Sequence, residues 1–177
     1  MEISKTETPD GQVTFDYSGL GFVLPPGSGH DSPQKKSRSW DLRFHPEGVD
    51  ALVVFSWMGD NQVGEGLDFA GVDVLASETT KSLEENGWSV ARQPITVPGA
   101  KEATSLTWEE PATEDTRQEF PDIDRFTCKL AMILGQNGYY YEATYCFGEG
   151  DAAAEAMADE SMKSLKIDVG YPGNRKN

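Results

Sequence analysis

The chain has 177 residues, of which 37% are hydrophobic, and this is enough for one domain around a single core. Its 30 acidic residues against 15 basic ones give a formal net charge of −15 at pH 7. Such a surface repels the phosphates of nucleic acids and anionic membranes, so no nucleic-acid partner is expected. The same acidity also fits a solubility or salt adaptation.

The sequence gives no sign of secretion or of membrane insertion. Its start, Met1 to Lys5, lacks the apolar core of a secretory signal. No segment approaches the ~18 consecutive apolar residues of a membrane-spanning helix. We therefore expect a cytoplasmic protein without a transmembrane segment. A cell-envelope location stays open if an N-terminal anchor has been removed.

The first predicted element is a β-hairpin with arms at residues 13–17 and 20–24 and a turn at Ser18-Gly19. Folding about this turn brings every apolar residue of both arms to one face, which is the internal test of a register. The predicted pairs are Tyr17 with Leu20, Phe15 with Phe22 and Val13 with Leu24. Residues 1–12 are expected to form an N-terminal tail.

Residues 25–39 are rich in Gly, Ser and Pro and are predicted to form a mobile loop. Strands are predicted at 40–45 and 51–57, the second apolar on both sides. A helix follows at about 68–86, and Gly87 ends it because glycine accepts a positive φ. The buried stripe of this helix is predicted to be Val72, Leu75, Ala76, Thr79 and Leu83.

The second half of the chain repeats the order of strands followed by a helix. Short links between successive strands require antiparallel pairing, so the predicted fold class is α+β with an antiparallel sheet. Residues 13–169 are expected to form the single domain and 170–177 a C-terminal tail. The remaining predicted elements are strands at 88–97 and 102–109, an acidic loop at 110–122, a long hairpin with arms at 124–134 and 139–147, and a helix at about 152–164 capped by Asp151.

The two cysteines, Cys128 and Cys146, lie on opposite arms of the long hairpin. A four-residue loop at 135–138 pairs Leu134 with Tyr139 and turns the two thiols to opposite faces. This register gathers the aromatic residues of one arm on the face that holds Cys128. We therefore predict free thiols, with Cys128 as a buried hydrophobe. A one-residue slip, which would allow a disulfide, is the alternative.

No pattern of catalytic, metal-binding or cofactor-binding residues stands out. The two histidines, His30 and His45, are far apart in the sequence and are interpreted as solvated loop residues. No Gly-x-Ser-x-Gly motif is present to hold a nucleophile. The glycines of residues 64–71 do not have dinucleotide-loop spacing, and Glu65 and Asp68 would repel a pyrophosphate.

Three features are candidates for partner binding. Lys35, Lys36 and Arg38 form a basic island in an acidic chain, which suits an acidic partner or merely keeps a loop soluble. Phe120 stands in the middle of the acid-rich loop, where an exposed aromatic ring would indicate a contact point. Tyr140 alternates with its tyrosine neighbours and would be a surface aromatic if the sheet were covered on one side only.

Five short segments, spread along most of the chain, together suggest a known family: residues 17–26, Asn86-Gly87-Trp88, residues 97–100, residues 138–145 and residues 164–167. They resemble the PsbP-like superfamily, and more closely its actinobacterial LpqN-type branch. This resemblance implies an antiparallel sheet flanked by helices in an α-β-α sandwich, and a non-enzymatic role. Relatives include a photosystem II extrinsic subunit, a Ran-binding import factor and cell-envelope lipoproteins. The chain lacks the signal and the lipidated cysteine of the LpqN branch.

The leading hypothesis is a non-catalytic module that binds an unidentified protein partner through its loops or one sheet face. The alternative is a small-molecule or lipid-binding domain, which requires an apolar cavity between helix and sheet. An enzyme ranks third and would require His30, His45 and carboxylates to meet in a cleft. No cofactor or metal is expected.

Overall fold

The computed structural model describes residues 2–9, 11–36, 39–58 and 71–171. Its helices are α1 (Val72–Glu85), α2 (Glu114–Glu119) and α3 (Ala152–Ser164). Its strands are β1 (Ile3–Glu7), β2 (Val13–Tyr17), β3 (Leu20–Leu24), β4 (Gly29–His30), β5 (Gln34–Lys35), β6 (Trp40–His45), β7 (Ala51–Met58), β8 (Val90–Pro94), β9 (Ala100–Pro111), β10 (Arg125–Gly135), β11 (Tyr140–Gly148) and β12 (Lys166–Ile167).

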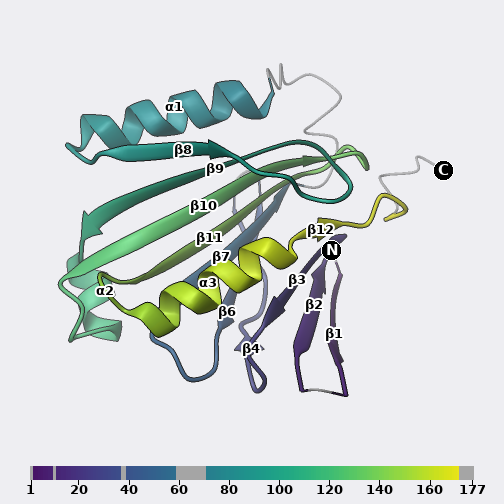
Figure 1. The fold of residues 1–177 in the computed structure, drawn as a ribbon, viewed down its shortest axis with the longest axis horizontal. Helices are drawn as coiled ribbons and strands as arrows, with labels where there is room; N and C mark the ends of the chain where they lie inside the picture. The colour runs from purple at the N-terminus through teal and green to yellow at the C-terminus, as the bar shows by residue number, and fades with distance from the viewer. Residues whose placement is uncertain (1, 10, 37–38, 59–70, 172–177) are drawn as a thin grey trace.

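The strands form two antiparallel sheets (Figure 1). The smaller sheet has the order β1-β2-β3-β12, and the larger has the order β4-β6-β7-β11-β10-β9-β8, with β5 also paired to β6. The predicted class, α+β with antiparallel pairing, is confirmed. The expectation of one sheet is wrong, because the first hairpin pairs with the N-terminal residues and with the last strand rather than with the strands that follow it.

The first hairpin, β2 and β3, has the predicted register, with Tyr17 opposite Leu20 and Phe15 opposite Phe22. Its turn is formed by Ser18 and Gly19, which both have a positive φ, as a tight hairpin turn requires. Two loop predictions differ from the structure. Residues 3–7, expected in a tail, pair with β2, and the loop at 25–39 contains the short strands β4 and β5.

The long hairpin, β10 and β11, has a register one residue away from the predicted one. Leu134 pairs with Tyr140 instead of Tyr139, and this places Cys128 directly opposite Cys146. The two cysteines form a disulfide bond. The prediction of free thiols is therefore wrong, and the alternative of a one-residue slip is correct.

The tip of this hairpin explains the shift. The backbone N–H of Gly135 donates a hydrogen bond to the carbonyl of Tyr139, and Gly138 has a φ of +85°. Together these features define the common three-residue hairpin loop that ends in a left-handed residue. The loop proper is thus 136–138, and Gly135 already belongs to the strand. A four-residue loop starts one position too early.

The observed register assigns alternate residues of the hairpin to two separately buried faces of the larger sheet. Ala143, Tyr145 and Phe147 point to the face covered by α3 and the smaller sheet, which we call the α3 face. The opposite face, which we call the α1 face, holds the disulfide together with Leu130 and Met132. The sequence analysis had placed these two sets of residues on one face.

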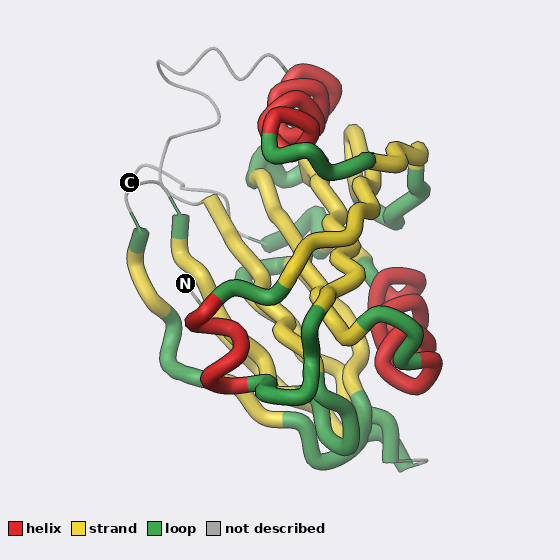
Figure 2. The backbone as a smooth tube through the Cα atoms, turned by 90° about the vertical axis from the view of Figure 1, so that its left-hand side faces the viewer, coloured by secondary structure: helices red, strands yellow, loops and turns green. Residues whose placement is uncertain are grey.

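The helices α1 and α3 pack on opposite faces of the larger sheet and are well separated in Figure 2. Helix α1 contacts β8, β9 and β10, whereas α3 contacts β11 and the β3 strand of the smaller sheet. Each helix therefore covers only part of the larger sheet. On the α3 face, β8 and β9 extend beyond the area that α3 covers (Figure 1).

The helix predictions hold in their essentials. Helix α3 has the predicted bounds, and the Asp151 side chain accepts a hydrogen bond from the Ala154 N–H. Helix α1 buries Val72 and Ala76 of its predicted stripe. It begins at Val72, and most of the first turn predicted for it lies outside the described residues. Helix α2 was not predicted; it lies inside the acidic loop and begins at a capping box formed by Thr113 and Thr116.

The disulfide gives a direct test of the hairpin register. We expect no thiol to react in the denatured, unreduced protein, and two to react after reduction. Replacement of both cysteines by alanine should lower the free energy of unfolding by about 3 kcal/mol, because the closed loop that constrains the unfolded chain is lost. Labelling followed by mass spectrometry, and urea unfolding of variant and wild type, measure the two effects. Two reactive thiols before reduction would contradict this register.

Candidate interaction surface

The structure does not expose the three predicted contact features as one surface. Lys35 lies on β5 with its ammonium group over the ring of Trp40, 5.8 Å from the centroid. The backbone N–H of Lys36 donates a hydrogen bond to the carbonyl oxygen of Ser39. Both lysines are exposed, and Arg38 lies outside the described residues. Lys35 thus lies on a short strand paired with β6 at the sheet edge, within the segment predicted to be a loop.

Phe120 is not an exposed contact point. Its ring packs edge-on against Phe126 with the centroids 6.0 Å apart, and it belongs to the hydrophobic cluster of the α1 face. Helix α2 brings this about: the chain turns after Glu119 and folds Phe120 inward. Phe120 is therefore not the exposed ring on which the prediction of a contact point depended, and it anchors the acidic segment to the sheet.

Tyr140 is also buried, with 1% of its surface exposed, so its interpretation as a surface aromatic is wrong. Its hydroxyl donates a hydrogen bond of 2.8 Å to Oε1 of Glu142, on the same face of β11. Burial raises the pKa of the Glu142 carboxyl above its usual value, the hydrogen bond from Tyr140 opposes this change, and the negative charge of Asp41 adds to it. The condition set for Tyr140, a sheet covered on one side only, is not met.

A charged hollow lies beside Lys36. It has a volume of about 340 Å³ and contains carboxylates as well as cations. Arg43 is bound to Glu119 of α2, and Asp31 lies 2.7 Å from Nε2 of His45. The lining holds two carboxylates, Asp31 and Asp41, and two cations, Lys36 and Arg43, so it has no net formal charge. Its lining residues are Asp31, Ser32, Gln34, Lys36, Asp41, Arg43 and Val54.

A larger groove lies at the other edge of the same sheet, where α1 ends, β8 begins, β9 ends and β10 begins. These segments meet at the left of Figure 1. The groove has a volume of about 710 Å³. We call it the β8 groove. It is lined by Asn86, Gly87, Trp88, Ser89, Val90, Ala91, Thr107, Trp108, Glu109, Pro111, Arg125 and Thr127.

The uncovered part of the α3 face forms one part of the β8 groove, and residues of the α1-face cluster, Trp88, Val90 and Trp108, line the rest. The pairing of Ala91 with Thr107, and of Glu109 with Thr127, places small and polar side chains in rows across β8, β9 and β10. Ala91 is exposed, and the two threonines are half-buried. Small side chains leave the backbone of these strands accessible, which suits contact with another polypeptide better than chemistry on a small molecule.

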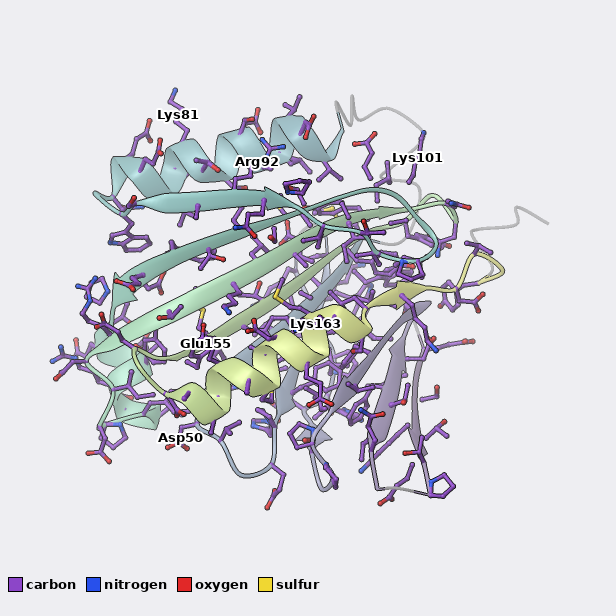
Figure 3. All side chains as sticks on the ribbon, in the orientation of Figure 1. Asp50, Lys81, Arg92, Lys101, Glu155 and Lys163 are labelled. Atoms are coloured by element: carbon purple, nitrogen blue, oxygen red, sulfur yellow. A yellow bond between two sulfur atoms is a disulfide. The ribbon has the colours of Figure 1, made fainter. Side chains whose placement is uncertain are left out.

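Strand β8 borders this groove and is an edge strand. Among the described strands it pairs only with β9, so one side of its backbone has no strand partner. Its residues Ala91 to Pro94 are exposed. Arg92 points toward α1, as Figure 3 shows, where it forms an ion pair with Asp73 and a hydrogen bond to Ser77. The free edge of β8 is thus not shielded by a charged side chain projecting along it.

The charge around the β8 groove is negative. Arg125 lies between Glu109 and Glu149, at 3.7 and 3.5 Å. On the neighbouring wall, Lys129 of β10 lies between Glu155 and Asp159 of α3, at 3.2 and 2.6 Å. Each cation therefore faces two carboxylates. The C-terminus of α1, with no basic residue in its last turn, adds the negative end of a helix dipole.

Sequence reasoning missed this groove for an identifiable reason. None of its residues carries unusual chemistry, and its shape depends on α3 covering β11 but not β8. One signal was present in the sequence: the C-terminus of the first helix, with Glu84 and Glu85, is electrostatically unfavourable and lies next to Trp88.

Comparisons with known proteins do not assign the chain to a family. No family model matches the sequence, and no curated protein matches it. Among solved structures, a mutant of the protein Mog1 is similar with a TM-score of 0.46 and 12% sequence identity, over 94% of this chain and 96% of that chain. A likeness of this size carries no argument about function.

The described residues were also examined for membrane-spanning helices and for groups of metal-binding side chains. No helix there combines the length and the apolar character needed to cross a membrane. In that part of the chain, His, Cys, Asp and Glu side chains also form no group of three that would hold a metal ion.

The buried Glu142 predicts a pH-dependent effect. The pKa of the Glu142 carboxyl is higher in the folded state than in the unfolded state, because burial disfavours its charged form. The free energy of unfolding therefore falls as the pH rises from the ordinary pKa of glutamate through the raised pKa. Glu142→Gln removes the charge and keeps an acceptor for Tyr140. We expect the variant to be more stable than wild type at pH 7, with the difference shrinking at acid pH. Urea unfolding at several pH values measures this; a pH-independent difference would contradict it.

Phe120→Ala should destabilise the protein. The ring is partly buried, so we expect a loss of about 2 kcal/mol, below the 3–5 kcal/mol of a fully buried phenylalanine. Phe120→Leu serves as the matched variant and should retain most of the stability. Urea unfolding of both variants provides the measurement, and equal stability of Phe120→Ala and wild type would show that the ring is not packed.

Proposed function

We propose that this protein is a non-catalytic interaction module that binds an extended segment of a partner protein in the β8 groove. The observation that carries the proposal is the uncovered end of the α3 face, a groove of about 710 Å³ bordered by a free edge strand. A sheet edge and its adjoining face recognise polypeptides through backbone hydrogen bonds and shallow side-chain contacts. The groove thus takes the role that the sequence analysis had given to Lys35, Lys36, Arg38, Phe120 and Tyr140.

The alternative, a small-molecule or lipid-binding domain, has weaker support. The hollow between β3 and α3 has a volume of about 270 Å³. This volume lies at or below the low end of the roughly 300–1,000 Å³ usual for small-molecule sites. Polar groups at its rim include Gln12 and Glu160, joined by a hydrogen bond of 3.3 Å. These properties favour a surface depression over a lipid cavity.

Membership of the PsbP-like superfamily, in its LpqN-type branch, forms part of this proposal. Its support remains the set of short segments quoted from the sequence, among them the first hairpin and the turn at Pro98-Gly99. Gly99 has a φ of +78°, and a Cβ at this position would lie 2.4 Å from the carbonyl oxygen of Ile167. Glycine is therefore required at position 99, in the turn between β8 and β9, because this turn packs closely against β12.

The disulfide bears on the compartment. Disulfide bonds persist in oxidising environments and are rare in the cytosol. The Cys128–Cys146 bond therefore favours the cell-envelope alternative over the cytoplasm that free thiols had suggested. We propose that the protein works in such an oxidising compartment.

Selection from a phage-displayed library of random peptides tests the proposed function. Peptides enriched on the wild-type protein should bind Ala91→Trp at least about tenfold more weakly, because an indole at this exposed position fills the groove. Ala156→Trp, an equivalent change at an exposed position of α3, should bind them normally. Failure to enrich any peptide, or equal binding to the Ala91→Trp variant, would contradict the proposal.

A further inference from the structure

Within this proposed function, on which the inference rests, we propose that the partner segment is a cationic strand that adds to the free edge of β8. Three independent features of the described residues support this: the unpaired backbone of β8, the acidic groups on both sides of it and the direction in which its side chains point.

The backbone of β8 presents hydrogen-bonding groups on its free side. The carbonyl of Gln93 accepts hydrogen bonds from the hydroxyls of Thr104 and Ser105, so the main chain of Gln93 faces β9. In antiparallel pairing this orientation alternates from residue to residue, so the N–H and C=O of Arg92 face outward. A further strand would pair with these groups and extend the sheet, as in peptide recognition by strand addition.

On the α3 face, an added strand would lie at the same end of the sheet as an acidic region on β9, β10 and α3, with β8 between them. The groups around Arg125 and around Lys129 each combine one cation with two carboxylates, so each has a net charge of −1. Side chains of the added strand that point to this face would enter the groove beside Glu109. A cationic side chain there completes the neutralisation, whereas an acidic one would be repelled.

On the α1 face, the added strand would run along the side of α1 that already holds Arg92. Asp73 and Ser77 contact Arg92, and the helical spacing places Thr80 and Glu84 on the same side. Asp73, at one end of this side, is already paired with Arg92, so Glu84 at the other end supplies its net negative charge. Since side chains of a strand alternate between the two faces, basic residues at neighbouring positions would meet acidic groups on both.

Strand addition also explains why the side chains on β8 are small or already engaged. Ala91 and Gln93 point to the α3 face, and Arg92 is held by α1. No side chain of β8 lies across the free edge in the described structure. Edge strands are usually blunted by such side chains, because an open edge invites pairing with another chain. Pro94 blunts the end of β8 because it lacks an N–H, but from Val90 to Arg92 the edge stays available. The surrounding acidic surface favours a cationic strand over an acidic one.

Amide hydrogen exchange with a defined probe tests this proposal. The probe is a ten-residue peptide in which pairs of adjacent lysines alternate with valine-threonine pairs, so that lysines point to both faces of the added strand. We expect it to slow exchange of the Arg92 amide by about tenfold or more at saturation. Its binding should weaken several-fold when the salt concentration rises from 50 to 300 mM, because the contact is between charges near the surface. The corresponding glutamate peptide should not bind.

Matched variants and a modified peptide separate the possible outcomes. Glu109→Gln and Asp73→Asn should each weaken binding of the lysine peptide about threefold, whereas Asp50→Asn, a change at an exposed position away from β8 in Figure 3, should not. A peptide N-methylated at alternate residues should lose the protection of β8. Equal binding of the N-methylated peptide, protection at β1 instead of β8, or no binding of the lysine peptide would overturn strand addition. The proposed function itself fails only if the library selection does.

Discussion

The register of the β10–β11 hairpin is the constraint on which the rest of the structure depends. These two strands are the centre of the larger sheet, and both of their faces are buried. Because side chains alternate, a shift of one residue would exchange the residues that contact α3 with those that contact α1. The observed register places Tyr145 under α3, where its hydroxyl meets Ser161, and brings Cys128 to Cys146 on the α1 face. The disulfide thus fixes the pairing that assigns every side chain of the sheet to its layer.

The fold could be predicted from the sequence wherever one face of an element is buried and the other is not. The first hairpin has this character, and its register followed from gathering Phe15 and Phe22 on one face. The stripe of α3 and its Asp151 cap followed in the same way. The long hairpin has apolar residues on both faces, so alternation favours neither register. In this hairpin the length of the turn sets the register. The sequence prediction did not take into account that Gly138 can adopt a left-handed conformation, which shortens the loop to three residues.

The burial of both sheet faces also explains why the two aromatic residues predicted as contacts, Phe120 and Tyr140, are not exposed. Phe120 and Tyr140 were judged by their residue type, on the assumption that one sheet face was open. With both faces covered near the centre, aromatic side chains there serve the core. The accessible part of the sheet lies at β8, beyond the reach of α3, and it is built from small residues such as Ala91. Residue type alone gives no hint of such a surface, because its shape comes from where helices are absent.

The central claim is that the register of the β10–β11 hairpin separates two covered faces and leaves the β8 edge accessible. Through-space NMR contacts between backbone α-protons of the two strands test it most directly. The account predicts cross-strand contacts of Leu130 with Thr144 and of Met132 with Glu142. Contacts of Leu130 with Ala143 and of Met132 with Tyr141 would instead mean that the strands are shifted by one residue. That result would contradict the assignment of residues to both faces and, with it, the geometry of the β8 groove.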